Sequence, residues 1–365
     1  MIRVKKIVNL LVRNKIKLCC GVPDSVLKNL TSEFDKDKRI RNIITPNEGS
    51  SVALATGHYL SEKKLACVYL QNSGLGNAIN PLSSITHKKV YSIPMLLMIG
   101  WRGANGKNDE PQHVVKGLIT KKILSLLEIR YLEINSKNLS KIQELISYSK
   151  KYSVPVACLF KNNSFKKKKI NSKIIVKNGI KRSLFIIELL KNISKNTKII
   201  STTGYTSREL YQIRNETNCK KGKDFYMVGG MGHASMMALG ISLNKKEQIV
   251  CLDGDGSFLM HLGSLNSIGK FGKNNFKHIM FNNNVHESVG GQTTYSENIQ
   301  FKKLIDSFGY KSYKKIDERN DLNKEIKKFL KLRGPSFLEV KTSIGTLANL
   351  TRPKNLIRVK NDFKN

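Results

Sequence analysis

The chain has 365 residues, enough for two domains of ordinary size, each with its own core. Its hydrophobic content of 40% argues against disorder, and no apolar run approaches the ~20 residues of a membrane span, so we expect no membrane partner. The formal charge of +37 could indicate a polyanionic partner, but the lysines are spread along the chain without a nucleic-acid-binding signature. We therefore predict a globular protein that does not act on nucleic acid.

The first predicted element is an amphipathic helix, because Val4, Val8 and Leu11 follow one another at helical spacing among basic residues. No continuous apolar region is present, so we interpret this segment as part of the fold rather than as a signal peptide; a basic transit peptide is the alternative. The six cysteines lack CxxC spacing, which favours a reducing, cytoplasmic location without a metal–thiolate site.

Short apolar runs alternate with helical patterns in both halves of the chain, which predicts an α/β fold with mostly parallel sheets and helices on both faces. A basic, irregular segment at 166–182 reads as a linker, so we expect one domain at 1–165 and another at 183–365. The predicted strands are 18–22, 43–45, 65–70, 93–100 and 154–160 in the first half, and 198–202, 225–228, 248–253, 278–282 and 336–341 in the second.

Two predicted strands in the second half end at oxygen-bearing side chains. The strand at 248–253 leads into Gly-Asp-Gly-Ser, which contains Asp255, and the strand at 278–282 leads into Asn283. Ligands bind at the carboxyl ends of parallel strands, and carboxylate and amide oxygens suit a hard divalent cation. We expect Ser257 to begin a helix whose first amides favour an anion. The pattern predicts a site for a divalent cation and a phosphate-bearing cofactor, although turn chemistry alone is an alternative explanation.

This pair of strand ends resembles the magnesium–diphosphate motif of thiamine-diphosphate-dependent enzymes. The resemblance implies that Mg²⁺ is bound by Asp255, Asn283 and the backbone carbonyl of Val285, which stands where glycine or alanine is more usual. It also implies that the diphosphate is contacted by Gly254, Gly256 and Ser257. The fold that it implies is a pyrimidine-binding domain at 1–165 followed by a diphosphate-binding domain at 183–365.

The same family requires a glutamate from the other domain, which interacts with the aminopyrimidine of thiamine diphosphate. Glu48 matches this position, before a small-residue helix and a Ser-Gly-x-Gly turn. On its own, a glutamate in a first helical turn would only be favourable to the helix dipole. The segment at 228–234 is also similar to the family. This resemblance implies that Gly230 contacts the cofactor and that Met231 is the apolar wedge under it. The alternative is that Met231 is a methionine of the core.

Four finer motifs resemble the phosphonopyruvate decarboxylases of this family; they lie at residues 20–30, 71–82, 99–113 and 282–292. This implies a carboxy-lyase of phosphonate metabolism, as in 2-aminoethylphosphonate biosynthesis, that converts 3-phosphonopyruvate to phosphonoacetaldehyde and CO₂. Sulfopyruvate decarboxylation, or another 2-oxo acid decarboxylase or oxidoreductase with the same cofactor, stays open. The absence of Cys₄ spacing counts against an oxidoreductase. The presence of Glu48 argues against a further alternative, a subunit that binds the cofactor but is catalytically silent.

The substrate is then a small anionic 2-oxo acid, and its phosphonate needs fixed donors. Arg102 is the first candidate because a guanidinium matches phosphonate oxygens, and Gln292 in the glycine-rich loop is the next. His286 and His113 are candidate catalytic residues. By the same resemblance, active sites form between the subunits of a homo-oligomer.

Overall fold

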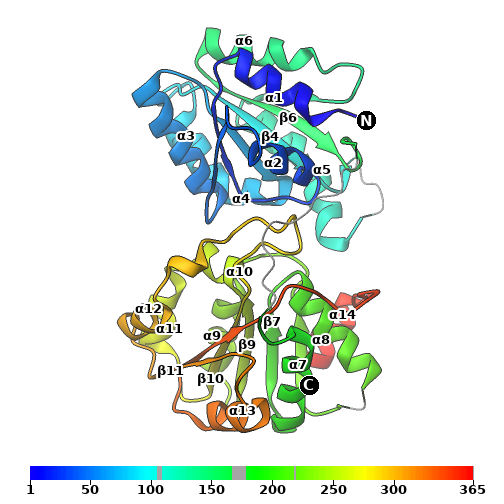
Figure 1. Ribbon diagram of the computed structural model, residues 1–365, viewed down its shortest axis with the longest axis vertical. Helices are drawn as coiled ribbons and strands as arrows, with labels where there is room; N and C mark the ends of the chain where they lie inside the picture. The colour runs from blue at the N-terminus through cyan, green and yellow to red at the C-terminus, as the bar shows by residue number, and fades with distance from the viewer. Residues whose placement is uncertain (105–108, 167–177, 218, 365) are drawn as a thin grey trace. The chain divides into compact units, whose positions relative to one another are not determined.

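The computed structural model describes residues 1–104, 109–166, 178–217 and 219–364. The chain forms two compact units, residues 1–172 with 289–292 and residues 173–288 with 293–365 (Figure 1). Most of the predicted linker at 166–182 lies outside the described residues. No helix in the described ranges has the length and apolarity that crossing a bilayer requires.

The first unit contains a six-stranded parallel sheet in the order β2-β1-β3-β4-β6-β5. Its strands are β1 (Leu18–Gly21), β2 (Arg41–Ile44), β3 (Cys67–Gln71), β4 (Met95–Trp101), β5 (Arg130–Glu133) and β6 (Pro155–Lys161). Its helices are α1 (Val4–Arg13), α2 (Lys28–Phe34), α3 (Glu48–Glu62), α4 (Leu75–Pro81), α5 (Pro111–Leu126) and α6 (Lys141–Tyr152).

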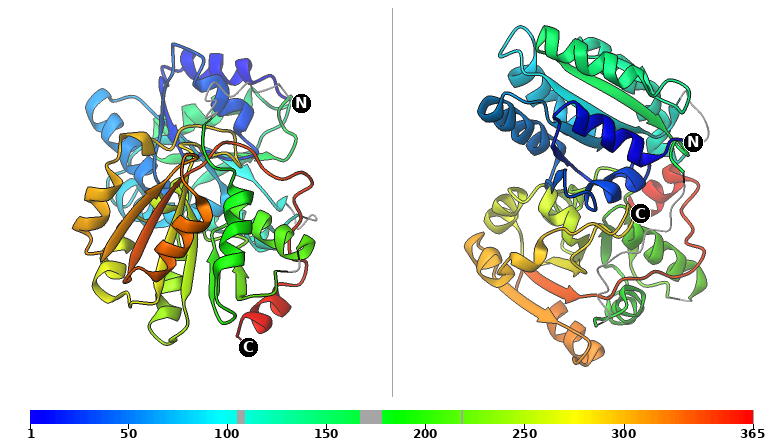
Figure 2. Two further views of the ribbon diagram at one scale, coloured as in Figure 1. Left: turned by 60° about the horizontal axis from the view of Figure 1, so that its bottom comes forward. Right: turned by 45° about the horizontal axis from the view of Figure 1, so that its top comes forward.

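Helices cover both faces of this sheet (Figure 2). One face packs against α1, α2 and α6, which contribute Ile7 and Leu145 to one apolar cluster. The other face packs against α3, α4 and α5, which contribute Val52 and Leu124 to a second cluster. Full burial of a Leu or Ile side chain stabilises the fold by about 1.5–3 kcal/mol, so the two clusters fix the sheet between its helix layers. The predicted amphipathic first helix is confirmed, with Ile7, Val8 and Leu11 buried.

The second unit repeats this architecture with the strand order β11-β12-β10-β9-β7-β8, again all parallel. Its strands are β7 (Lys198–Ser201), β8 (Lys223–Tyr226), β9 (Ile249–Gly254), β10 (Phe276–Asn282), β11 (Ser312–Ile316) and β12 (Ser336–Lys341). Its helices are α7 (Arg182–Asn192), α8 (Tyr205–Glu216), α9 (Ala234–Ser242), α10 (Asp255–Met260), α11 (Ser264–Phe271), α12 (Phe301–Ser307), α13 (Leu322–Lys331) and α14 (Leu356–Lys364).

Two further apolar clusters lie on the two faces of the second sheet. Phe185 of α7 and Ile326 of α13 join the cluster on one face, whereas Ala238 of α9 and Ile305 of α12 join the cluster on the other. The predicted α/β class with parallel, two-sided sheets is confirmed in both units.

Most predicted strand bounds differ from the observed ones by a residue or two, as for β8 at Lys223–Tyr226, and three larger details differ from the sequence-based expectation. The prediction omitted β5 and β11, which are edge strands in their sheets. Their sequences, Arg-Tyr-Leu-Glu and Ser-Tyr-Lys-Lys-Ile, carry the charged residues that edge strands tolerate and therefore lack a continuous apolar run. The helix after β9 begins at Asp255, two residues before the predicted start at Ser257.

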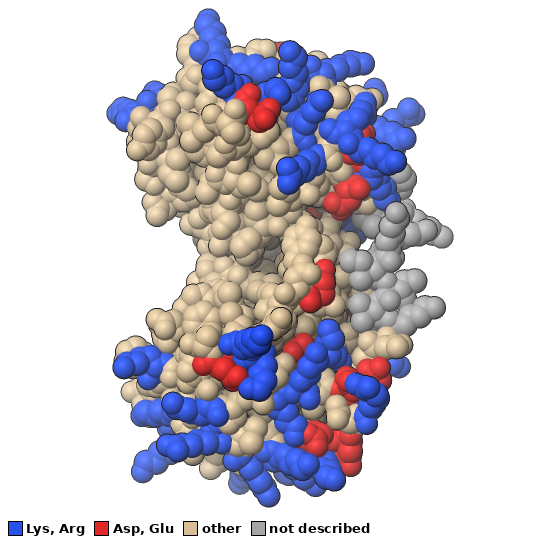
Figure 3. Space-filling view, turned by 60° about the vertical axis from the view of Figure 1, so that its left-hand side comes forward, with Lys and Arg blue, Asp and Glu red and all other residues tan. Residues whose placement is uncertain are grey.

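Basic side chains are spread over several elements of each unit on the face drawn in Figure 3, with acidic residues among them. This distribution agrees with the even spread of lysine along the sequence.

Candidate active site

Glu48 is the first residue of α3 and is only 5% exposed. The helix begins there because the Asn47 side chain accepts a hydrogen bond from the Ser50 amide at 2.9 Å, as a good N-cap does. Asn77 Nδ2 donates to Glu48 Oε2 at 2.7 Å. Burial raises the pKa of the Glu48 carboxyl, and the Asn77 hydrogen bond opposes that shift only in part. The side chain is therefore a fixed carboxyl that holds a proton more readily than a solvated glutamate.

The Ser-Gly-x-Gly turn leaves room for this carboxylate. A Cβ atom on Gly74 would fall on Glu48 Oε1, so no larger residue fits there without moving the glutamate. Lys116 is close enough for its charge to lower the Glu48 pKa, and its Nζ donates to the Ser73 carbonyl at 3.3 Å. Burial lowers the pKa of Lys116 in turn.

In the second unit, the register between β9 and β10 brings the two predicted strand ends together. Phe281 pairs with Gly254, so Asp255 and Asn282 follow side by side at the carboxyl edge of the sheet. Asp255, Asn283 and Val285 are all buried at this edge. The predicted convergence of oxygen-bearing residues at one edge is therefore present in the structure.

Asp255 is a buried carboxylate that is bonded by hydroxyl and amide groups. Thr294 Oγ1 and Ser296 Oγ donate to Oδ2 at 2.7 and 3.0 Å, and the Gly256 amide donates to Oδ1 at 3.0 Å. Burial raises the pKa of Asp255 to about 6, and these hydrogen bonds offset the shift only partly. Among the described residues, no cationic side chain bonds to Asp255. A bound cation would supply the missing counter-charge, so this donor set fits a hard divalent ion.

Asn283 and Val285 complete the predicted ligand set. The Val285 amide donates to Asn283 Oδ1 at 3.2 Å, and Asn283 Nδ2 donates to Glu287 Oε2 at 3.2 Å. The Val285 carbonyl accepts a hydrogen bond from the Glu287 amide at 2.9 Å. Sequence reasoning missed Glu287, as it missed Thr294 and Ser296, because polar loop residues give no periodic signal.

Ser257 connects the turn after β9 to the segment that contains Met231. Its hydroxyl accepts from the Gly232 amide at 3.0 Å and lies 2.7 Å from Thr202 Oγ1. Gly230 and Gly232 have positive φ angles of 65° and 86°, which favour glycine. Met231 is half-buried, so its side chain is not enclosed in the core and can contact a ligand.

His286 packs against the same turn. A Cβ atom on Gly256 would lie 2.6 Å from His286 Cε1, so Gly256 provides the space for the ring. Burial lowers the pKa of His286 to about 4. The ring is therefore neutral at pH 7, with one nitrogen that carries a proton and one that can accept a hydrogen bond.

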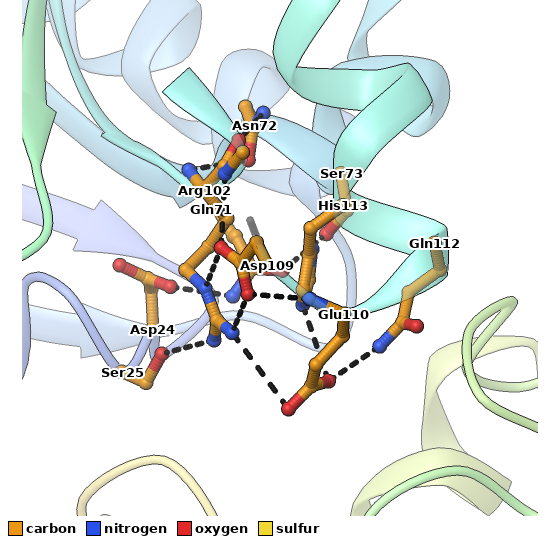
Figure 4. A network of polar contacts seen from close by, with 11 residues as sticks. Asp24, Ser25, Gln71, Asn72, Ser73, Arg102, Asp109, Glu110, Gln112 and His113 are labelled. Atoms are coloured by element: carbon orange, nitrogen blue, oxygen red, sulfur yellow. Dashed lines mark hydrogen bonds and ion pairs between the residues drawn. The ribbon is translucent and has the colours of Figure 1, made fainter. Parts of the chain in front are cut away.

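Arg102, Asp109 and His113 form one polar network in the first unit (Figure 4). Arg102 Nε and Nη2 bind the Asp109 carboxylate at 2.8 and 2.5 Å, and Arg102 Nη1 donates to Ser25 Oγ at 3.3 Å. Although burial raises the pKa of Asp109, Arg102 and two backbone amides hold it well below its usual range. A phosphonate at Arg102 would therefore compete with a carboxylate that is already bound.

His113 is buried beside this ion pair. Burial, followed by the charge of Arg102, lowers the pKa of His113 to about 4, so this ring is also neutral at pH 7. Gln292 falls within the first unit, where its Nε2 donates to Thr31 Oγ1 at 3.0 Å.

Asp24 is a buried acid beside this network that the sequence did not single out. Its Oδ2 accepts from the Val26 and Leu27 amides, both at 2.9 Å, and its Oδ1 accepts from Gln71 Nε2 at 2.6 Å. Burial raises its pKa despite these hydrogen bonds. The Val-Pro-Asp-Ser turn after β1 was the available signal in the sequence.

A second group of residues that the sequence did not single out lies within β9 and β10, before their carboxyl ends. The register of β9 and β10 places Cys251 opposite His278, and potential ligand atoms of these residues and Asp253 lie within 4.8 Å of one another. His278 Nδ1 is 3.0 Å from Tyr310 Oη, within a set of aromatic contacts. His278 Nε2 lies 3.5 Å from Asp253 Oδ2 and makes no hydrogen bond among the described residues, so we interpret the group as a buried polar cluster.

Comparisons with known proteins find matches in both units of the chain. Residues 4–123 match the family described as "Thiamine pyrophosphate enzyme, N-terminal TPP binding domain", and residues 202–340 match "Thiamine pyrophosphate enzyme, C-terminal TPP binding domain". The two units thus define a thiamine pyrophosphate enzyme.

Full-length relatives narrow this class. A phosphonopyruvate decarboxylase of Streptomyces viridochromogenes is 31% identical over 352 residues, which cover 92% of this chain and 87% of the relative. A phosphonopyruvate decarboxylase of Streptomyces hygroscopicus is 30% identical over 355 residues, which cover 92% of this chain and 86% of the relative. A sulfopyruvate decarboxylase of Methanosarcina acetivorans is 24% identical over 359 residues, which cover 92% of this chain and 90% of the relative. The chain belongs to the thiamine-pyrophosphate-dependent decarboxylases of the phosphonopyruvate and sulfopyruvate type, which confirms the predicted family and enzyme class.

Proposed function

We propose that this chain decarboxylates 3-phosphonopyruvate to phosphonoacetaldehyde and CO₂, with thiamine diphosphate and Mg²⁺ as cofactors. The substrate assignment is supported by the higher identity to two phosphonopyruvate decarboxylases than to the sulfopyruvate decarboxylase of comparable coverage. The observation that carries the chemistry is the buried carboxyl of Glu48, whose pKa is raised and whose position is fixed.

Glu48 would hold a proton against the pyrimidine ring of the cofactor. Its raised pKa favours the shared proton that this contact needs, and Asn77 fixes the direction of the carboxyl group. The bound cofactor supplies a nucleophilic carbon and accepts the electron pair that the departing CO₂ leaves behind. His286 is neutral and can accept a proton near the turn at Gly256.

Asp255, Asn283 and the carbonyl of Val285 would hold Mg²⁺, and Gly254, Gly256 and Ser257 would contact the diphosphate. The burial of Asp255 without a cationic partner among the described residues supports this assignment. Gly230 and Met231 would lie beside the cofactor, with Met231 as an apolar contact. His113, like His286, is retained as a candidate catalytic residue.

Arg102 would bind the phosphonate if the substrate displaces Asp109 or adds to the Nη1–Nη2 edge of the guanidinium, where Ser25 and Glu110 are its present neighbours. Gln292 is the second candidate for this contact. Because the carboxyl of Glu48 belongs to one unit and that of Asp255 to the other, one cofactor must contact both kinds of unit. We propose that this happens between subunits of a homo-oligomer.

The test of substrate choice compares the two acids directly. The protein would be incubated with thiamine diphosphate, Mg²⁺ and either 3-phosphonopyruvate or sulfopyruvate, and the kcat/KM for aldehyde formation would be measured. We expect a higher value for the phosphonate. A higher value for the sulfonate would reassign the substrate while leaving the cofactor chemistry intact, and turnover of neither acid would reject the proposal.

A further inference from the structure

Glu287 lies beside the proposed magnesium ligand Asn283. We propose that Glu287 is a positioning residue that sets the orientation of the Asn283 amide toward the metal; this inference rests on the magnesium site of the proposed function.

An asparagine ligand has an orientation problem that an aspartate does not have. Its two terminal atoms have nearly the same shape, yet only Oδ1 can bind a cation, because the NH₂ end carries donor protons. In this structure Nδ2 donates to Glu287 Oε2, and Oδ1 accepts from the Val285 amide. An ionised carboxylate only accepts hydrogen bonds, so Glu287 selects the orientation in which the NH₂ group of Asn283 faces it. Oδ1 keeps a lone pair for a cation.

The carboxylate of Glu287 is itself held in place on both oxygens. The Gly345 amide donates to Oε1 at 2.5 Å, and Arg182 Nη1 donates to Oε2 at 3.3 Å. Arg182 is only 5% exposed, and its Nε donates to Glu209 Oε2 at 2.5 Å. A charge-assisted chain thus runs from Glu209 through Arg182 and Glu287 to Asn283.

This chain joins segments that are far apart in the sequence. Arg182 begins α7, Glu209 lies in α8, and Glu287 lies in the loop after β10. Glu209 Oε1 also accepts from the Leu347 amide at 3.0 Å, and Arg182 Nη2 donates to the Gly345 carbonyl at 3.4 Å. The orientation of Asn283 is therefore fixed by the packing of the second unit and not by its own loop alone.

The first experiment substitutes Glu287→Gln, which replaces one acceptor oxygen with an NH₂ group. With Gln Oε1 facing the Gly345 amide, its NH₂ group would face Nδ2 of Asn283 and favour a flipped amide. Outer-shell partners typically change metal affinity 10- to 100-fold, so we expect at least a tenfold weaker Mg²⁺ affinity. Mg²⁺ would be titrated calorimetrically at fixed thiamine diphosphate, and saturating Mg²⁺ should restore thiamine diphosphate affinity.

The matched control is Glu297→Gln, the same change at an exposed position ten residues further along the chain. Its carboxylate contacts Thr293 Oγ1 at 3.3 Å and lies outside the chain of contacts described above. We expect this control to bind Mg²⁺ as the wild type does. Equal Mg²⁺ affinity of E287Q and wild type would overturn the positioning role.

A double-mutant cycle separates positioning from a merely structural role. In Asn283→Asp both terminal atoms are oxygens, so no orientation has to be selected. We expect E287Q to cause no loss of Mg²⁺ affinity in the N283D background, because it also removes repulsion between two neighbouring carboxylates. A tenfold loss that persists in that background would show that Glu287 acts on the fold and would overturn the inference.

Two further controls keep the outcome interpretable. If E287Q does not fold, as judged by circular dichroism, Glu287→Asp replaces it in the double-mutant cycle. This substitution shortens the side chain by one methylene group and so moves the carboxylate away from Nδ2 of Asn283. If the wild-type chain shows no Mg²⁺-dependent binding of thiamine diphosphate, the proposed magnesium site fails and the inference fails with it. That result differs from a wild type that binds Mg²⁺ with an affinity insensitive to Glu287.

Discussion

Glu48 is the residue whose environment departs most clearly from that of an ordinary helix-terminal glutamate. A surface glutamate at this position would contribute a few tenths of a kcal/mol through the helix dipole. Here burial raises the pKa of Glu48, and Asn77 and Gly74 fix the position of its carboxyl group. Burial of a carboxyl group without a charged partner costs folding stability. Contact with a bound ligand would explain why the glutamate occupies this position.

Substituting Glu48→Gln should keep the fold and lower turnover by about 10²–10⁴-fold, because the amide cannot share a proton with the pyrimidine. Steady-state kinetics with saturating cofactor would measure this. The control is Glu62→Gln, at the exposed last residue of the same helix, which should leave turnover unchanged. Near-normal turnover of E48Q would remove the glutamate from the mechanism.

His113 predicts a dependence of stability on pH. Its folded-state pKa is lowered from 6.5 to about 4 by burial and by Arg102. The stabilising effect of the neutral ring is therefore present above pH 6.5 and is lost as pH falls from 6.5 through 4. At most this amounts to about 3 kcal/mol, and solvent screening reduces it.

The variant His113→Gln should accordingly lose less stability than the wild type between pH 7 and pH 5. Chemical unfolding at each pH would measure the two free energies of unfolding, and the comparison at pH 7 corrects for lost packing. Parallel pH profiles for the two proteins would contradict the assigned pKa.

Among the elements, the start of α4 offers a matched pair of glycines, Gly74 directly before the helix and Gly76 as its second residue. A Cβ atom at Gly74 would collide with the Glu48 carboxylate, whereas a Cβ atom at Gly76 would contact nothing within 4 Å. Gly74→Ala should therefore move the Glu48 carboxylate. Because a displacement of a catalytic group by about 1 Å can slow a reaction about 10²-fold, we expect turnover to fall by about that factor. Gly76→Ala should retain turnover and can add up to about 1 kcal/mol of helix stability. Kinetics and thermal unfolding of both variants would check this, and equal turnover would contradict the described packing.

The interior elements could be predicted from the sequence, because buried parallel strands such as residues 93–100 are continuous apolar runs. The edge strands β5 and β11 could not, since they are four and five residues long and their charged residues interrupt any apolar run. The position of Asp255 and Asn283 at one edge of the sheet was predictable because strand ends in a parallel sheet converge. The pairing of Arg102 with Asp109 was not, because nothing in sequence spacing shows which acid folds back onto which base.

At the scale of the whole molecule, the two units share one strand-order pattern and together match the two halves of a thiamine pyrophosphate enzyme. Each unit contains one buried carboxyl group of the proposed function, Glu48 in the first and Asp255 in the second. The high positive charge is spread over several elements of each unit on the face drawn in Figure 3 and would favour small anionic substrates.

The most direct test of this account mixes two variants that should each be inactive, Glu48→Gln and Asp255→Ala. Co-refolded or co-expressed chains would form mixed dimers in which one of two sites combines an intact Glu48 from one chain with an intact Asp255 from the other. With random pairing and sites between subunits, we expect recovery of up to about a quarter of wild-type turnover. Substantial activity of D255A alone, or no recovery in mixtures shown to contain mixed dimers, would contradict the claim that the two carboxyl groups serve one cofactor across subunits.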